Sequence, residues 1–267
     1  MSSNKPIGIF DSGIGGLTVA NSINKLLPNE KIIYFGDTVH LPYGNKSPKK
    51  INEFSEKIVK FLLEKKCKAI VFACNSASAT SFDNITKKYN GETIFFNVID
   101  PVIDYIKSCK NFKNIGVIGT EATINSQVYS RKIYEAKKNI LVKPMATPLL
   151  AGLIEDNKST FFSNGILKEY LENKLLKGID SLILGCTHYP IISQEISSIF
   201  KNTIEIISSD NLLSYELKNI LKKNKILNKS GNQIKHQFFI SDYSKSFQLK
   251  SKMFFKSEII LEEENIF

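Results

Sequence analysis

Two stretches of the chain read Ala69-Ile70-Val71-Phe72-Ala73-Cys74-Asn75-Ser76 and Ser181-Leu182-Ile183-Leu184-Gly185-Cys186-Thr187-His188. Each is a short apolar run that ends in a cysteine and then turns polar. Continuous apolar runs of this length are typical of strands in parallel sheets that are covered on both faces. The two cysteines stand 112 positions apart, which indicates that a strand and its following loop occur twice in the chain.

Two further pairs of segments repeat at nearly the same spacing. The run Pro6-Ile7-Gly8-Ile9-Phe10 recurs as Asn114-Ile115-Gly116-Val117-Ile118 at an offset of 108, and the run 94–100 recurs as 203–210 at an offset of 110. Self-similarity at a fixed period is the sequence signature of repeated structural units. Three repeats at one spacing predict that the chain consists of two homologous halves.

Apolar runs alternate with helical patterns in both halves. Strands are expected at 6–10, 31–35, 69–73, 94–98, 114–118, 140–144, 181–185 and 203–207, with a further strand near 236–241 that returns to the first sheet. The stretch from Ile51 to Lys65 has apolar residues at helical spacing. This alternation predicts the α/β fold class, with two pseudo-symmetric α/β sandwich domains and mainly parallel sheets. The expected domains are 1–97 plus 211–267, and 98–210.

The composition is that of an ordinary globular protein. Of the 267 residues, 42% are hydrophobic and 23% are charged, which excludes a disordered chain. No run approaches about 18 consecutive apolar residues, so we expect no membrane span. The first residues form no apolar signal segment, and four cysteines are too few for a disulfide scaffold. We therefore expect a cytoplasmic protein with reduced thiols.

The net charge of +10 invites a nucleic-acid interpretation. Arg131 is the only arginine among the 36 basic residues, however, and the lysines are scattered among Asn and Ile. Proteins that read phosphates and bases favour the bidentate guanidinium group. We expect solvated lysine-rich faces and no requirement for nucleic acid.

A glycine-rich loop, Asp11-Ser12-Gly13-Ile14-Gly15-Gly16, follows the first predicted strand. Its glycines permit a tight turn, and the N–H groups at the start of the next helix can hold an anion. The spacing matches neither common nucleotide-binding pattern, so it indicates no nucleotide. Capping of the helix by Asp11 or Ser12 is the alternative interpretation.

Cys74 and Cys186 end equivalent strands, and ligands of open parallel sheets bind beyond the carboxyl ends of the strands. His188 stands close enough to Cys186 to act as a proton partner. The other two cysteines, Cys67 and Cys109, have no such context and are interpreted as structural.

Several chemistries could use this pair of thiols. Zinc could bind Cys74, Cys186 and His188, although no C-x-x-C or H-x-x-x-H spacing is present. A disulfide switch is a second alternative, and a Cys–His hydrolase would explain only one of the two cysteines. A reaction that inverts a stereocentre uses a base on one face and an acid on the other, and it therefore accounts for both.

The order of motifs resembles the glutamate racemase family, within the cofactor-independent aspartate/glutamate racemases. The matching segments are 8–17, Gly36-Asp37-Thr38, Pro42-Tyr43-Gly44, 73–79, Gly119-Thr120 with Ala122-Thr123-Ile124, Leu153-Ile154-Glu155 and 185–190. One departure is Ser76, where the family usually has threonine. Serine keeps the hydroxyl group and loses a methyl group, so we expect a modest effect on packing or affinity.

This resemblance implies the roles of individual residues. Cys74 and Cys186 would exchange the α-proton on opposite faces, with Asp11 assisting the first thiol and His188 and Glu155 the second. The residues that would line the substrate pocket are Asp11, Ser12, Pro42, Tyr43, Gly44, Asn75, Ser76, Thr120, Thr187 and His188.

The resemblance also implies that the two domains face each other, with the active site in the cleft between them, and it implies the biological setting. The enzyme would interconvert L- and D-glutamate in the cytoplasm as a homodimer, without cofactor or metal, and supply D-glutamate for peptidoglycan. Aspartate or another small acid is the alternative substrate.

Overall fold

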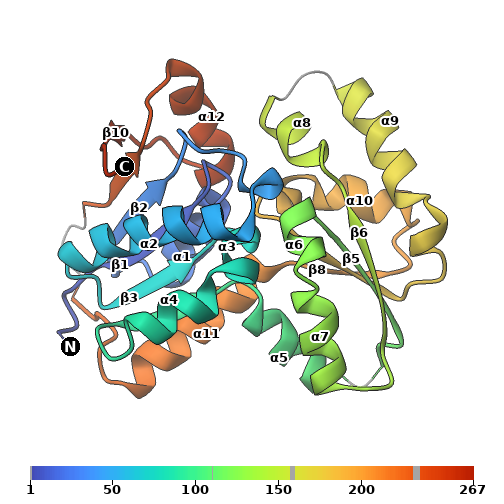
Figure 1. The fold of residues 1–267 in the computed structure, drawn as a ribbon, viewed down its shortest axis with the longest axis horizontal. Helices are drawn as coiled ribbons and strands as arrows, with labels where there is room; N and C mark the ends of the chain where they lie inside the picture. Colours follow the sequence, from blue (N-terminus) through green and yellow to red (C-terminus); the bar gives the residue numbers. More distant parts are fainter. Residues whose placement is uncertain (1, 110, 157–159, 231–234) are drawn as a thin grey trace.

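The computed structural model describes residues 2–109, 111–156, 160–230 and 235–267. Within these ranges the chain folds into two lobes, each built on a parallel sheet with helices on its faces (Figure 1). The first sheet has the order β10-β9-β2-β1-β3-β4 and the second the order β6-β5-β7-β8. The first sheet consists of β1 (Ile7–Asp11), β2 (Ile32–Gly36), β3 (Ala69–Phe72), β4 (Ile94–Asn97), β9 (Gln237–Ile240) and β10 (Leu261–Glu263). The second consists of β5 (Asn114–Gly119), β6 (Leu141–Ala146), β7 (Ser181–Gly185) and β8 (Glu205–Ile207).

The repeat seen in the sequence is confirmed in the strand order. β2-β1-β3-β4 in the first sheet corresponds to β6-β5-β7-β8 in the second, and every pair of neighbours is parallel. All nine predicted strands are present, with ends within two residues of those expected. The strand β10 was not predicted, because it is three residues long and two of them are exposed glutamates.

Twelve helices connect the described strands and cover the sheets. They are α1 (Leu17–Leu26), α2 (Pro48–Glu64), α3 (Asn75–Thr80), α4 (Phe82–Lys88), α5 (Asp100–Ser108), α6 (Glu121–Asn125), α7 (Val128–Ala136), α8 (Leu150–Asp156), α9 (Thr160–Leu171), α10 (Ser193–Ile199), α11 (Ser209–Lys223) and α12 (Lys245–Phe255). The helix expected at 51–65 is confirmed as α2. It begins where the Ser47 side chain accepts a hydrogen bond from Lys50 N and Pro48 occupies the first turn.

A crevice forms at the carboxyl end of β1 in the first sheet and of β5 in the second. From β1 the chain passes to β2 on one side and later to β3 on the other, so the loops that follow β1 and β3 leave in opposite directions. The same divergence occurs at β5, which lies between β6 and β7. Ligands bind at such switch points of parallel sheets, because the diverging loops leave space there. The Asp11 loop and both cysteine loops leave the sheets at these points.

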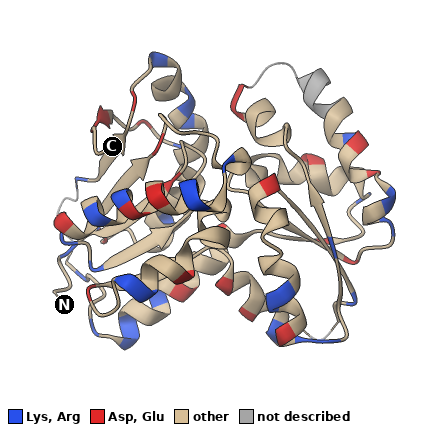
Figure 2. Ribbon diagram, in the orientation of Figure 1, with Lys and Arg blue, Asp and Glu red and all other residues tan. Residues whose placement is uncertain are grey.

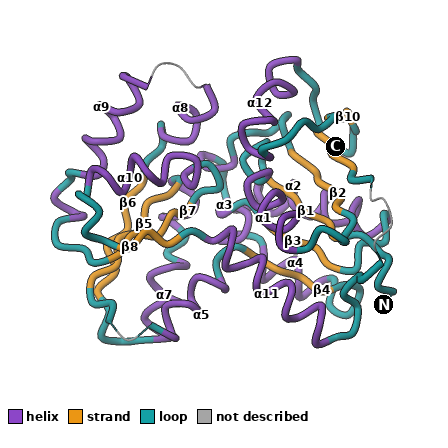
Figure 3. Tube along the Cα trace, turned by 180° about the vertical axis from the view of Figure 1, so that it is seen from behind, coloured by secondary structure: helices purple, strands orange, loops and turns teal. Residues whose placement is uncertain are grey.

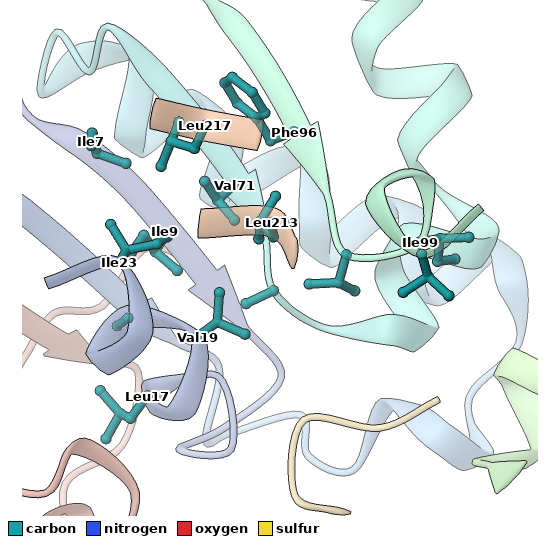
Figure 4. Packing of buried hydrophobic residues seen from close by; sticks show 14 of the residues in the cluster. Ile7, Ile9, Leu17, Val19, Ile23, Val71, Phe96, Ile99, Leu213 and Leu217 are labelled. Carbon is teal, nitrogen blue, oxygen red and sulfur yellow. The ribbon is translucent and has the colours of Figure 1, made fainter. Parts of the chain in front are cut away.

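A continuous apolar core joins the two lobes. Side chains of β1, β3 and β4 pack against α1 and α11, including Ile9, Val71, Val19 and Leu213 (Figure 4). The same cluster continues into the second sheet through residues such as Val117. Residues on the other face of the first sheet pack against α2 in a separate cluster. The contacts of α11 with both α1 and α5 place it beside both halves (Figure 3).

Strands β9 and β10 bring the end of the chain back to the first sheet. The division into a domain of 1–97 plus 211–267 and a domain of 98–210 is a proposal, which this return of the chain supports. Lysines and acidic residues alternate along the outer helices in the view of Figure 2. Among the described residues, no helix is long and apolar enough to cross a membrane.

A buried ion pair closes the amino-terminal end of the first sheet. Lys68 Nζ lies 2.6 Å from Glu30 Oε2, and both side chains are almost fully buried. The same ammonium group donates to the carbonyl oxygens of Ser3 and Ile226, while Glu30 Oε1 accepts from Asn228 N. The pair therefore ties the start of the chain and the segment after α11 to β3.

We expect Glu30→Gln to lower the free energy of unfolding by about 3 kcal/mol, because it leaves the Lys68 ammonium group buried without its carboxylate. Urea denaturation followed by circular dichroism measures this change. The matched control is Glu53→Gln, which breaks an exposed pair with Lys50 and should change stability far less. Equal losses of stability in the two variants would contradict the stabilising role of the buried pair of Lys68 and Glu30.

Candidate active site

A cavity of about 580 Å³ lies between the two lobes. The first lobe contributes Ser12, Pro42 and Gly44 to its wall, and the second contributes Thr120, Glu155 and His188. All six belong to the site residues predicted from the sequence. Five of them follow strands β1, β2, β5 and β7, and Glu155 lies near the end of α8, which follows β6, so the carboxyl ends of both sheets border one space.

The first thiol lies directly behind this wall. Cys74 follows β3 at the start of α3, and its sulfur is 3.6 Å from Ser12 Oγ. The side chain is buried. Burial, and then the nearby Asp11 carboxylate, raise the pKa of the Cys74 thiol to about 12. Cys74 is therefore a protonated thiol at neutral pH and needs a base to become a thiolate.

Asp11 organises the loop that leads from β1 to α1. Its Oδ2 accepts hydrogen bonds from Gly13 N at 3.2 Å and Gly16 N at 3.0 Å. Its Oδ1 is buried without a hydrogen-bond partner among the described residues. Burial raises the pKa of this carboxyl, against the opposing effects of His188 and the two N–H groups. The capping interpretation is wrong, because no side chain caps the first turn of α1, whose N-cap residue is Gly16. Asp11 instead binds N–H groups of the loop that precedes the helix, and its second oxygen is left available.

The second thiol is part of a chain of three side chains. Cys186 follows β7, and its sulfur is 3.5 Å from His188 Nδ1, while His188 Nε2 is 2.7 Å from Glu155 Oε1. Burial lowers the pKa of His188, but Cys186 and Glu155 raise it by more, so this pKa lies well above its usual value. The raised pKa favours a protonated imidazole beside a Cys186 thiolate, and this proton can be exchanged with the neighbouring sulfur.

The two thiols are close enough to interact electrostatically. Cys186 is one of the groups that raise the pKa of Cys74, and neither cysteine forms a disulfide. Each sulfur contacts a residue of the cavity wall, Ser12 for Cys74 and His188 for Cys186. One cavity therefore has a thiol behind each of its two sides.

Glycine is required where the Asp11 loop meets the second lobe. A Cβ atom at Gly15 would lie 2.3 Å from His188 Cε1 and 2.6 Å from Thr187 Oγ1. A Cβ atom at Gly16 would lie 2.5 Å from that of Asp11. Gly15 thus lets the two lobes approach closely, and Gly16 lets the loop fold tightly against Asp11 of its own lobe.

The remaining predicted residues lie around the thiols. Ser76 Oγ lies 2.8 Å from Thr120 Oγ1 in the opposite lobe, and Thr187 O accepts a hydrogen bond from Thr18 of α1. Asn75 is buried beside Cys74. Tyr43, like Asn75 and Thr187, is buried behind the cavity wall, and its hydroxyl group donates to Asp37 Oδ2 at 2.7 Å.

Three residues near the site were not assigned roles from the sequence. Asp37 is fully buried at the end of β2 and accepts hydrogen bonds from Tyr43, His40 and Ser241. Its position after a parallel strand is the signal that could have found it. Phe254 of α12 packs edge-on against the His188 ring, and Tyr129 of α7 reaches Asn75. No strand end or motif marks these two aromatic residues.

Two pseudo-symmetric lobes of parallel strands thus border a shared cavity with a thiol behind each of its sides. The Asp/Glu/Hydantoin racemase family matches residues 7–209, and the chain belongs to this family. The glutamate racemase of Chlorobaculum parvum is 37% identical over 97% of this chain and 95% of that protein.

Solved structures of glutamate racemases are also similar to this chain. A crystal structure of glutamate racemase from Francisella tularensis in complex with D-glutamate has a TM-score of 0.91 at 37% identity, covering 99% of this chain and 98% of that one. A structure of the glutamate racemase isoform RacE1 from Bacillus anthracis has a TM-score of 0.93 at 33% identity, covering 98% of both chains.

The electrostatic environment of Cys74 can be tested with a thiol reagent. Only the thiolate reacts with iodoacetamide, and Asp11 contributes to the raised pKa of Cys74. We expect Asp11→Asn to lower that pKa and speed the labelling of Cys74 at pH 8, by about tenfold for each unit of pKa. Peptide mass spectrometry measures the rate for each cysteine separately.

Cys67 is the internal control in this experiment. Burial also raises its pKa to about 12, but Asp11 is not among the causes, so its labelling rate should not change. Labelling of Cys74 that is unchanged or slower in Asp11→Asn would show that the carboxylate does not act on this thiol.

Proposed function

We propose that the protein interconverts L- and D-glutamate by proton transfer between two thiols and Cα of the substrate, without a cofactor. The observation that carries this proposal is the pair of free, buried thiols at equivalent strand ends behind one cavity. Membership of the racemase family and the 37% identity to glutamate racemases support the reaction and the substrate.

The reaction needs one thiolate and one thiol at the same time. The thiolate sulfur takes the α-proton and leaves the electron pair on Cα, and the opposite thiol then donates its proton to the other face. The sulfur that began as a thiolate ends as a thiol, and the reverse reaction begins with the roles exchanged. Positioning and a water-poor site support this step, because the α-proton of an amino acid is a very weak acid.

Asp11 is the base that we assign to Cys74. Its free Oδ1 can accept the thiol proton, and its raised pKa brings the carboxyl closer to the thiol in acidity. The positive charge of the substrate ammonium group would further favour a thiolate here. Asp11 could also bind that ammonium group directly, since both roles use the same free oxygen.

His188 and Glu155 serve the second thiol. Glu155 holds the imidazole through Nε2, so that Nδ1 lies toward Cys186. The charged imidazole can supply a proton to this sulfur or stabilise its negative charge. A carboxyl group thus assists one thiol and a histidine the other, so the two directions of the reaction use chemically different bases.

The substrate carboxylates require hydrogen-bond donors on both sides of the cleft. Asn75, Ser76 and Thr187 are buried beside the thiols and carry suitable N–H and O–H groups. Ser12 and Thr120 offer hydroxyl groups in the cavity wall itself. A role in supplying D-glutamate for peptidoglycan, a location in the cytoplasm and assembly as a homodimer belong to the same proposal and rest on the sequence resemblance.

The purified protein should racemise both enantiomers of glutamate without an added cofactor and incorporate solvent deuterium at Cα in heavy water. Chiral chromatography and mass spectrometry measure the two effects. Cys74→Ala and Cys186→Ala should each abolish racemisation, because each direction needs both sulfurs, whereas Cys109→Ala should remain active. Near-normal activity in either of the first two variants would exclude the two-thiol mechanism. Turnover of aspartate but not of glutamate would exclude glutamate as the substrate.

We expect His188→Asn to lower kcat in both directions, and to do so unequally, because His188 contacts only Cys186 of the two thiols. The equilibrium constant between mirror images is one, so kcat/KM must fall equally in both directions. Separate initial-rate measurements from L- and D-glutamate give the two kcat values. Unchanged kcat values would remove His188 from the mechanism.

A further inference from the structure

We propose that Tyr129 is a positioning residue that holds the Asn75 amide with its N–H₂ group available to a substrate carboxylate. This inference rests on the proposed function. It adds a residue of the second lobe to the recognition of the substrate by the first lobe.

The contact itself is a hydrogen bond between the two lobes. The Tyr129 hydroxyl group, on α7, donates to Asn75 Oδ1 over 2.8 Å. Tyr129 is 3% exposed and Asn75 is 2% exposed, so water does not compete for this bond. Burial also raises the pKa of Tyr129, which keeps the phenol protonated and able to donate.

The other end of the amide has no partner. Asn75 Nδ2 is buried and makes no hydrogen bond with any described residue. An unsatisfied buried donor costs free energy, and it persists where a ligand completes it. Asn75 is the residue after Cys74 and begins α3, so a ligand between the two thiols would lie beside this donor.

Tyr129 determines which end of the amide is left free. Its hydroxyl hydrogen has Asn75 Oδ1 as its only acceptor among the hydrogen bonds of the described residues. Rotating the amide by 180° would place Nδ2 against the hydroxyl oxygen and leave the phenolic hydrogen without an acceptor. The observed orientation satisfies the phenol and presents a donor, which is the group that a carboxylate needs.

The Tyr129 bond is one of several hydrogen bonds between the lobes. Ser76 contacts Thr120, and Thr18 donates to Thr187 O. The orientation of the Asn75 amide therefore depends on the packing of the second lobe against the first.

The test is Tyr129→Phe, which removes one oxygen atom and keeps the ring in its core position. We expect KM for both glutamate enantiomers to rise about tenfold, as for the loss of one hydrogen bond to a charged group. The kcat values should fall less than threefold, and the pH profile of kcat/KM should keep its shape, because neither thiol is touched. The matched control is Tyr89→Phe, which loses a hydroxyl bond to Glu56 on the outside of the first lobe and should keep the wild-type KM.

A double-mutant cycle separates positioning from a general structural role. Asn75→Ala should raise KM, and adding Tyr129→Phe to it should raise KM no further, because the amide to be positioned is gone. Additive effects on KM, or a wild-type KM in Tyr129→Phe, would overturn the inference while leaving glutamate racemisation intact. A lowered melting temperature with an unchanged KM would assign the hydroxyl group to stability alone and also overturn it. Absence of glutamate turnover in the wild-type protein would overturn the proposed function and this inference together.

Discussion

The divergence of the chain to the two sides of β1 in one sheet, and of β5 in the other, is the structural constraint on which the site depends. β1 has β2 on one side and β3 on the other, and β5 lies in the same way between β6 and β7. Residues at the ends of these strands therefore stand at the edges of a crevice rather than under a helix. Because the order of strands is repeated, Cys74 and Cys186 reach corresponding positions without any local motif in common beyond the strand itself.

The surroundings make the two equivalent thiols chemically different. Cys74 lies in a buried environment with a carboxylate, which together hold the thiol protonated at neutral pH. Cys186 lies beside an imidazole whose pKa is raised by this thiol and by the second carboxylate, Glu155, which also holds the ring in place. One backbone repeat thus carries two acid–base systems, and each is built from residues of its own loop and of a neighbouring element.

Most of the fold could be predicted from the sequence because the signals are local. Apolar runs give the strands, and their recurrence at one spacing gives the two halves and the correspondence of Cys74 with Cys186. Residues at the carboxyl ends of strands or shortly after them, such as Asp11 and His188, could be found by the same reasoning. The resemblance to a family added Glu155, which the structure places on His188.

Features that depend on tertiary contacts could not be predicted in this way. β10 is too short and too polar to be recognised, and it forms because β9 offers a free edge. The Pro-Tyr-Gly motif does not indicate that the hydroxyl group of Tyr43 donates to Asp37. Tyr129 stands in an ordinary amphipathic helix, and only the packing of one lobe against the other brings it to Asn75. Such contacts join distant parts of the chain and leave no periodic pattern.

A crystal structure of this protein with D-glutamate bound tests the central claim most directly. The two-thiol mechanism predicts Cα of the ligand between the sulfurs of Cys74 and Cys186, on opposite faces and about 3.5 Å from each, as direct proton transfer requires. A ligand with both sulfurs on one face of Cα, or with either sulfur separated from Cα by another side chain, would contradict it.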